Sequence, residues 1–419
     1  MNEKFLHYIW FKRLFSLEQT TTDGQKIEII DVGQPNNDAG ADVFNAKIKI
    51  GDTLWAGNVE FHSDAADWQR HKHNLDKAYD SVILHVVLKA GENAVRTNKT
   101  IVPQMVIKYP KHLEEQFEAI SLPFIPCAEK LIENQHNNLE KVFEKLLNER
   151  LENKLSAIEK LLEQTSGDWE EAFYITTARS FGFGTNADTF EALSRNLPQK
   201  LLAKHKDNPV QIEAMLFGVG GFLEKDCEDN YFKILKIEYQ YLKQKYQLQN
   251  IEISQWKFLR LRPTNFPTIR IAQFASLIFK SVKLFSKIIE QKNYKNLLEY
   301  YDCEPSEYWK THYLFGKKSE EKGKNISKSS VDILLINSVI PFLYAYGKKF
   351  NQKDISDFAF NLLNKIPAEK NRITKGFQTL NINVQNAAQS QALNELKTKY
   401  CDLKKCYICK QKHSICATS

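Results

Sequence analysis

Alternating apolar and polar residues predict a small sheet in the first quarter of the chain. Apolar side chains occupy every second position from Phe44 to Ile50, which is the period of a strand with one buried face. Gly51-Asp52 then predicts a tight turn into a second strand that ends near residue 62. The continuous apolar run at residues 82–88 predicts a strand covered on both faces.

The other segments of this region complete an α+β pattern. They predict a helix over 2–17, a strand over 26–33, a helix over 67–80 with Asp67 as its cap, and a last strand over 102–109. The sequence therefore predicts an α+β domain over residues 1–110.

From residue 111 the spacing of apolar residues becomes that of helices. A long Lys/Glu/Leu pattern covers 128–164, and further helices are predicted over 169–184, 211–224, 230–247, 271–285 and 330–350. We therefore expect a large all-α domain over 111–390. Residues 391–419 predict a helix followed by a cysteine-rich tail.

Length, charge and cysteine content limit the classes of protein to which the chain can belong. A chain of 419 residues exceeds one ordinary core and predicts roughly two or three domains. The net charge of +7 is compatible with a DNA or RNA partner, although this small excess is spread over a large surface. No apolar stretch reaches the ~18 unbroken residues of a membrane span. Seven cysteines without a disulfide-like spacing predict a cytoplasmic protein, and nothing predicts its oligomeric state.

The densest group of reactive side chains lies between residues 40 and 87. Four of the ten histidines, His62, His71, His73 and His85, fall within 24 residues. Asp42 precedes one predicted strand and Glu60 lies on its hairpin partner, so both carboxylates are expected at one end of the sheet. His62 follows Glu60 by two residues and shares its face. Such a pocket suits Mg²⁺ or Mn²⁺.

The remaining histidines are expected in supporting positions. On the predicted helix, His71 and His73 point about 200° apart, so only one of them faces the pocket, and Asp76 neighbours His73. If this segment were extended instead, the two histidines would share a face and form a zinc-binding pair. His85 lies in a buried strand, either as a neutral structural histidine or as a partner of Glu60 or the metal.

These motifs resemble the PD-(D/E)xK nuclease superfamily, over residues 1–110. Gly40-Ala41-Asp42 resembles its Asp motif, and Glu60-Phe61-His62 resembles its second motif with histidine in place of lysine. The resemblance implies a restriction-endonuclease-like mixed sheet flanked by helices. It also implies metal-dependent hydrolysis of phosphodiester bonds, with Asp42 and Glu60 holding the metal and His62 orienting the attacking water.

The whole chain also resembles an uncharacterised bacterial family of proteins of unknown function. The resemblance is carried by four segments, Gly40–Phe44, Trp55–His62, Asp67–Tyr79 and Leu84–Val87. This family has no assigned activity, so the resemblance implies membership but no mechanism.

The cysteine-rich tail is a second candidate metal site. Its pattern is Cys401-x4-Cys406-x2-Cys409-x6-Cys416, and thiolates at this spacing bind Zn²⁺ or an iron–sulfur cluster. Some nucleases of the superfamily carry a cysteine-ligated iron–sulfur cluster near the C-terminus, which would make Cys127 an alternative fourth ligand to Cys416. The alternative is a tail of reduced thiols without a metal.

Three functions follow from these patterns. The first is a metal-dependent nuclease in which Asp42, Glu60 and His62 carry the chemistry. The second is a non-catalytic scaffold that binds nucleic acid or protein, favoured by the histidine in place of the motif lysine. The third is a metal hydrolase for a small substrate, with zinc bound through His71 or His73.

Overall fold

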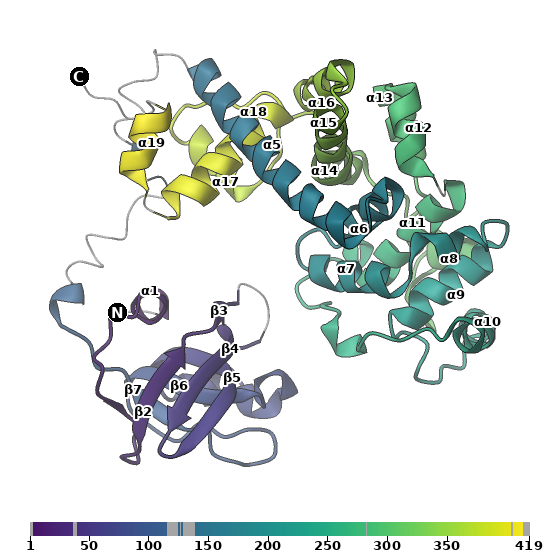
Figure 1. Ribbon diagram of the computed structural model, residues 1–419. Coiled ribbons are helices and arrows are strands. Elements are labelled where there is room, and N and C mark those ends of the chain that lie inside the picture. The colour runs from purple at the N-terminus through teal and green to yellow at the C-terminus, as the bar shows by residue number, and fades with distance from the viewer. Residues whose placement is uncertain are drawn as a thin grey trace. The chain divides into compact units, whose positions relative to one another are not determined.

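The chain forms two compact units, Met1–Leu122 and Pro123–Ser419 (Figure 1). The structure is a computed structural model, and it describes residues 3–36, 40–114, 125, 127–128, 139–281, 283–403 and 405–413. The first unit contains a mixed sheet and the second is almost entirely helical, which confirms the predicted α+β layout.

The sheet of the N-terminal unit has the order β1-β2-β4-β5-β6-β7, and β3 pairs with β4. β5 runs parallel to β6 and β6 runs parallel to β7, whereas the other pairs are antiparallel. The predicted hairpin at Gly51-Asp52 joins β4 and β5. The strands are β1 Gln19–Thr20, β2 Lys26–Asp31, β3 Gln34–Pro35, β4 Val43–Ile50, β5 Thr53–Asp64, β6 Val82–Lys89 and β7 Gln104–Val106.

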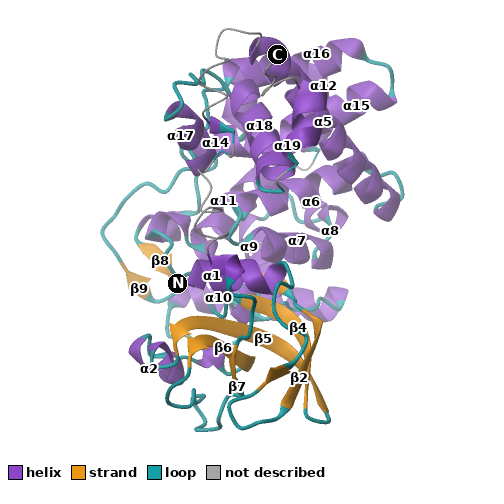
Figure 2. Ribbon diagram, turned by 90° about the vertical axis from the view of Figure 1, so that its left-hand side faces the viewer, coloured by secondary structure: helices purple, strands orange, loops and turns teal. Residues whose placement is uncertain are grey.

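Helix α1, Glu3–Phe11, packs across one face of the sheet (Figure 2). Phe5, Leu6 and Trp10 are fully buried there in one core with the apolar side chains of the strands. The helix ends well before the predicted residue 17, because Arg13 adopts a left-handed backbone with φ of 53°. The face of β5 and β6 that points away from this core carries the polar residues described below.

A bulge interrupts the predicted alternation in β4. Asn45 has φ of 56°, and the pairing with β5 shifts register between Val43 and Ala46. Alternation holds from Ala46 to Ile50, but Val43 is buried and Phe44 is only half-buried. The expectation that Phe44 shares the face of Ala46 is therefore wrong, because the extra residue reverses the order of the faces.

The helix predicted over 67–80 is wrong in all but its first turn. Helix α2 spans Asp67–Arg70 and is followed by two 3₁₀ turns, η1 at His73–Leu75 and η2 at Lys77–Tyr79. Lys72 breaks the helix because it takes a left-handed backbone with φ of 63°. Asp67 is the first helical residue rather than the cap, and it pairs with Arg70 at 2.8 Å.

The second unit confirms the predicted all-α region, apart from the short hairpin of β8, His312–Leu314, and β9, Lys317–Lys318. Its longer helices are α5 Leu139–Gln164, α6 Trp169–Phe181, α7 Ala187–Asn196, α9 Pro209–Val219, α10 Asn230–Tyr246, α11 Pro267–Lys280, α15 Ile340–Lys349 and α16 Lys353–Lys365. Shorter elements connect them: α8 Gln199–Ala203, η3 Ile253–Gln255, η4 Pro263–Asn265, α12 Leu284–Gln291, α13 Tyr294–Tyr300, η5 Glu307–Lys310, α14 Lys328–Leu334, η6 Leu335–Val339, α17 Arg372–Gln378, α18 Ala387–Glu395, η7 Leu396–Cys401 and α19 Cys406–His413.

One continuous helical segment, Lys328–Lys349, is long and apolar enough to cross a membrane. It comprises α14, the π-helical turn η6 and α15. However, 72% of its most apolar window is buried within the helical unit, which is the pattern of the core helix of a soluble protein.

The contact between α9 and α10 depends on Gly218. A Cβ atom placed there would lie 2.2 Å from the ring of Tyr239, which is itself buried. We expect Gly218→Ala to destabilise the helical unit by ~1–3 kcal/mol, because the ring must leave its packing position. Urea unfolding followed by far-UV circular dichroism measures this loss. The control Gly323→Ala, whose Cβ would meet no atom closer than 3.8 Å, should change stability little.

Candidate metal centre

Asp42 and Glu60 meet across the paired strands β4 and β5, as the sequence predicts. The backbone N–H of Asp42 donates to Glu60 Oε2 at 3.0 Å, and the backbone N–H of Phe61 donates to Asp42 Oδ2 at 3.0 Å. Each carboxylate therefore has one oxygen bound to the partner strand. The other oxygens face imidazoles: Asp42 Oδ1 lies 3.3 Å from His7 Nε2, and Glu60 Oε1 lies 3.4 Å from His73 Nε2.

His62 and His85 share the buried face of Glu60. Residues two apart on a strand point to the same side, which places His62 beside Glu60, with 3.7 Å between His62 Nε2 and Glu60 Oε1. His85 lies opposite Glu60 in the parallel pairing of β5 with β6. His62 Nδ1 and His85 Nε2 share a hydrogen bond of 2.9 Å, so His62 Nε2 is left to face Glu60.

The broken helix brings both His71 and His73 to this face. Ring nitrogens of His62, His71 and His73 all lie within 4.8 Å of one another, and we call these three residues the histidine triad. His62 Nε2 is 3.2 Å from His71 Nδ1. The expectation that only one of His71 and His73 faces the pocket is wrong, because the left-handed residue Lys72 turns the chain between them.

Aromatic rings hold the histidine triad in place. Trp68 is fully buried and donates from Nε1 to the carbonyl of Val95 at 2.9 Å. Its ring packs against His73 and His85, with centroids 5.4 and 5.2 Å away. The other side of His73 stacks on Tyr79 at 3.7 Å. Trp68 therefore forms a wall of the pocket, whereas Trp55 is 41% exposed on β5.

Burial favours the neutral forms of four groups at this site, Glu60, His62, His73 and His85. Burial, and then the charge of Asp42, raise the pKa of Glu60 to about 9. Burial is also the largest cause that lowers the pKa of His62 to about 2 and those of His73 and His85 to about 4. At neutral pH these three imidazoles are unprotonated, so their nitrogens offer lone pairs rather than positive charge.

These shifts predict how the stability of the metal-free chain depends on pH. The unfolded chain protonates its histidines below about pH 6.5, whereas folded His62, His73 and His85 resist this, so acid favours unfolding. Glu60 acts oppositely: its raised pKa stabilises the fold below its ordinary pKa of 4.5, and this contribution is lost as pH rises to about 9. Between pH 5 and about 6.5 the effect of three histidines exceeds that of one carboxyl group. The summed contribution of these four groups to the unfolding free energy should therefore rise over this range and then fall at higher pH.

His85→Leu isolates one of these contributions. The variant should reduce the rise in unfolding free energy between pH 5 and 6.5 by ~1.5 kcal/mol, because one buried histidine no longer resists protonation. Urea unfolding in EDTA, monitored by hydrogen exchange of the backbone amides of β5 and β6, measures how much the unfolding free energy rises between these two pH values. His112→Leu, at an exposed position, is the control. An unchanged slope in His85→Leu would show that His85 is protonated equally in both states.

The donor set fits a divalent transition metal ion. His73 Nε2 is buried without a hydrogen-bond partner, although it lies within ion-pair distance of Glu60 Oε1. Because His73 is neutral, the contact is no ion pair, and a buried nitrogen without a hydrogen bond is costly unless something binds it. Imidazole and carboxylate together suit Zn²⁺ or Mn²⁺ better than Mg²⁺, which prefers oxygen ligands alone.

His7 was not predicted as a member of this site, and Asp76 does not have the supporting position that the sequence predicts. His7, on α1, reaches Asp42 but carries no motif spacing, because the contact joins separate elements. Asp76 is exposed, and its Oδ1 accepts from the backbone N–H of Ala78 at 2.9 Å, so it caps the turn η2. No direct contact of Asp76 with the histidine triad is found among the described residues.

The predicted cysteine site is only partly within the described residues, because Cys416 lies outside them. Cys406 and Cys409 lie on α19, where Cys406 is exposed and Cys409 is buried, as is Cys401. Within the described ranges, the histidine triad is the one group of three His, Cys, Asp or Glu residues close enough to share a metal ion. Cys127 is half-buried. Zinc or iron–sulfur binding by these cysteines stays a prediction.

Comparison with known protein families assigns the chain. The sequence profile described as "Protein of unknown function (DUF2851)" matches residues 3–372. The chain belongs to the DUF2851 family. The predicted membership of an uncharacterised family is thus confirmed, and the DUF2851 match includes every residue of the candidate metal centre but ends before Cys401. No curated protein and no solved structure matches the chain.

Proposed function

We propose that the N-terminal unit is a metal-dependent hydrolase that cleaves phosphodiester bonds in nucleic acid. The observation that carries this proposal is the histidine triad itself, two of whose members, His62 and His73, lie within 3.7 Å of one oxygen of Glu60, next to Asp42 at the rim of the sheet. Carboxylates and neutral imidazoles that share one pocket are the ligands of catalytic divalent metal ions.

We further propose that this unit is a variant of the restriction-endonuclease-like fold. Three features support this: antiparallel pairing of β2, β4 and β5, parallel pairing of β5 with β6, and α1 across one face. Asp42 and Glu60 occupy the positions that the PD-(D/E)xK resemblance assigns to metal-binding carboxylates. His62 replaces the motif lysine.

In this proposal Glu60 and the histidine triad hold the metal ion, with Asp42 beside them. A bound divalent ion would lower the pKa of a water molecule and offset the charge that develops on the phosphate. His62 acts as a ligand rather than the base, because its pKa of about 2 leaves it unable to take a proton near neutral pH. His85 orients His62 by the bond to Nδ1, as partners of metal-bound histidines commonly do.

We assign proton transfer to His7. Its imidazole lies outside the ligand set, is 31% exposed, and contacts Asp42 Oδ1 at 3.3 Å. His7→Gln should therefore lower the cleavage rate by ~10²-fold while metal affinity stays within about twofold of wild type. Calorimetric titration with Mn²⁺ and a cleavage assay separate the two effects. Equal loss of both would make His7 a ligand instead.

The central experiment combines metal loading with a substrate panel. The chain is stripped with EDTA, reloaded with Mn²⁺, Zn²⁺ or Mg²⁺, and incubated with single- and double-stranded DNA and RNA. We expect cleavage with Mn²⁺ or Zn²⁺, less with Mg²⁺, and none in EDTA. If wild type cleaves no substrate faster than the Glu60→Gln variant, the proposed nuclease activity is wrong.

The histidine triad also favours a second candidate, a zinc hydrolase that acts on a small substrate. The same loaded protein should then hydrolyse small activated esters or phosphoesters in a Zn²⁺-dependent reaction and leave nucleic acid intact. The scaffold hypothesis predicts a third result, in which nucleic acid binds equally well with and without EDTA and no metal-dependent reaction occurs.

A further inference from the structure

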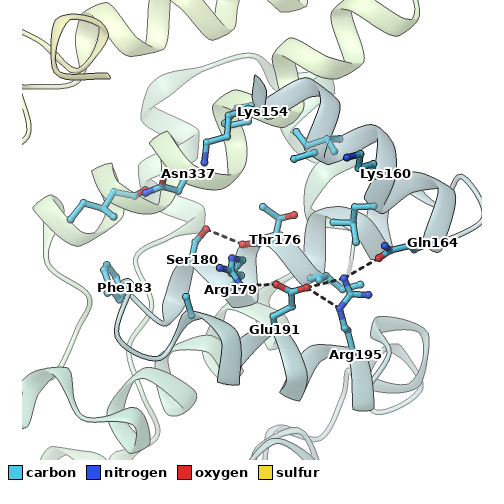
Figure 3. Close-up of a pocket in the computed structure, with 18 residues that line it drawn as sticks. Lys154, Lys160, Gln164, Thr176, Arg179, Ser180, Phe183, Glu191, Arg195 and Asn337 are labelled. Carbon is cyan, nitrogen blue, oxygen red and sulfur yellow. Dashed lines mark hydrogen bonds and ion pairs between the residues drawn. The ribbon is translucent and has the colours of Figure 1, made fainter. Parts of the chain in front are cut away.

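A cavity of about 700 Å³ lies within the helical unit (Figure 3). Residues of α5, α6, α7 and the helical segment of α14, η6 and α15 line it, so it belongs to the helical unit alone. Its volume falls within the range of sites that bind small molecules. None of the groups proposed above for metal-dependent hydrolysis reaches it.

The lining of the cavity is positively charged. It contains four cationic side chains, Lys154, Lys160, Arg179 and Arg195, and one carboxylate, Glu191. Glu191 lies 2.7 Å from Arg179 and 2.8 Å from Arg195, and these three residues form a row across the cavity from Lys154 (Figure 3). Arg179 also pairs with Asp188 Oδ1 at 2.6 Å, so two carboxylates orient the two guanidinium groups, and the surplus positive charge of the lining is that of Lys154 and Lys160.

Lys154 is the strongest sign that the cavity suits an anion. Its side chain extends from α5 into the cavity, and it has no hydrogen-bond or ion-pair partner among the described residues (Figure 3). Burial, and then repulsion by Arg150 and Arg179, lower the pKa of Lys154 to about 8, and the charges of Glu395 and Glu369 oppose this only in part. Arg150 is itself held by Gln391 and Glu395. An ammonium group in such surroundings is costly unless an anion accompanies it.

The rest of the lining suits an apolar body attached to that anion. Asn337 lies on the π-helical turn η6, a wide turn of the kind often found at functional sites. Its Nδ2 donates to the carbonyl of Ile333 at 3.0 Å, which leaves Oδ1 available to a ligand. Other lining residues are apolar: Ile158, Leu161, Ile175, Phe183, Ile333 and Pro341.

We propose that this cavity binds a phosphomonoester with an aromatic or apolar body, such as a nucleoside 5′-monophosphate. The phosphate lies against Lys154 and the arginine row of Arg179 and Arg195, where charge-assisted hydrogen bonds hold it. The apolar residues cover the remainder of the ligand, and Asn337 accepts a hydrogen bond from it.

Calorimetric titration of the full chain in EDTA tests the proposal without a contribution from the metal centre. The probes are the four common ribonucleoside 5′-monophosphates, their nucleosides and inorganic phosphate. At least one monophosphate should bind about tenfold or more tightly than both its nucleoside and inorganic phosphate. Lys154→Met should weaken that binding by about tenfold or more and leave nucleoside binding unchanged within about twofold.

Two further variants show whether weaker binding comes from loss of the contact with the ligand or from loss of the fold. Lys145→Met makes the same charge change on an exposed residue of α5 outside the cavity and should leave binding unchanged. Asn337→Asp keeps the side-chain shape but adds a negative charge, so it should weaken phosphate binding while circular dichroism stays as in wild type. The proposal is overturned if no monophosphate outperforms its nucleoside, or if Lys154→Met and Lys145→Met bind equally.

Discussion

Replacing Glu60 by glutamine should lower metal-dependent cleavage by ~10²-fold or more. Glu60 Oε1 lies within 3.7 Å of His62 Nε2 and within 3.4 Å of His73 Nε2, so it would supply negative charge to an ion held by the histidine triad. Glutamine keeps the shape of the side chain and can still accept the hydrogen bond from Asp42. The variant therefore removes the charge and retains the contact between the strands.

The same variant should not destabilise the metal-free protein. Because the pKa of Glu60 is about 9, its carboxyl group is protonated at pH 7 in the absence of metal, much as glutamine is neutral. Above pH 7, wild type should lose stability that Glu60→Gln keeps, since only wild type must ionise a buried group. Urea unfolding in EDTA at pH 7 and 9, paired with the cleavage assay, measures both effects.

Glu28→Gln, on the exposed side of β2, is the matched control for Glu60→Gln. It makes the same chemical change in the same sheet and should alter neither cleavage nor the dependence of stability on pH. Wild-type cleavage by Glu60→Gln would contradict the assignment of Glu60 as a ligand. A large loss of stability at pH 7 would instead show that its buried carboxylate is ionised in the metal-free fold.

Replacing Trp68 by alanine should have the largest effect on stability in the N-terminal unit, ~3–5 kcal/mol. Trp68 is fully buried and packs with Tyr79, Ala94 and Val102 in a small core beneath the metal centre. The substitution leaves a cavity and removes the ring against which the histidines rest, so metal affinity should also fall. Hydrogen exchange of β5 and β6 reports the stability, and calorimetry with Zn²⁺ reports the affinity.

Two companion variants separate the parts of this effect. Trp68→Phe keeps most of the ring but loses the hydrogen bond to Val95, so it should cost less than Trp68→Ala and retain metal binding. Trp55→Ala removes the same side chain at a position that is 41% exposed and should change stability little. Equal losses in Trp68→Ala and Trp55→Ala would contradict the role given to Trp68.

The sheet and one pair of carboxylates could be predicted because local patterns determine them. Alternation and a Gly-Asp turn specify the β4–β5 hairpin, and the hairpin in turn places Asp42 beside Glu60. The histidine triad could not be predicted, because residues 67–80 have helical composition and a single left-handed residue, Lys72, overrides it. Lysine is an ordinary helix former, so no residue type marks that break.

Contacts between elements far apart in the chain also could not be predicted from the sequence. His7 joins the candidate metal centre because α1 packs on the sheet. No spacing of residues along the chain predicts this packing. The cavity of the helical unit joins α5 to η6, so Lys154 and Asn337 approach only after the helices have packed. Periodicity predicted the helices themselves, since each buries an apolar face.

The order of the candidate metal ligands along the chain has a consequence for biosynthesis. Asp42, Glu60, the histidine triad and His85 all belong to one uninterrupted stretch, and His7 precedes it. The ribosome therefore releases every candidate ligand of the N-terminal unit before it has made the helical unit. If the proposed site binds a metal ion, a nascent chain would be able to acquire that ion while translation of the helical unit continues.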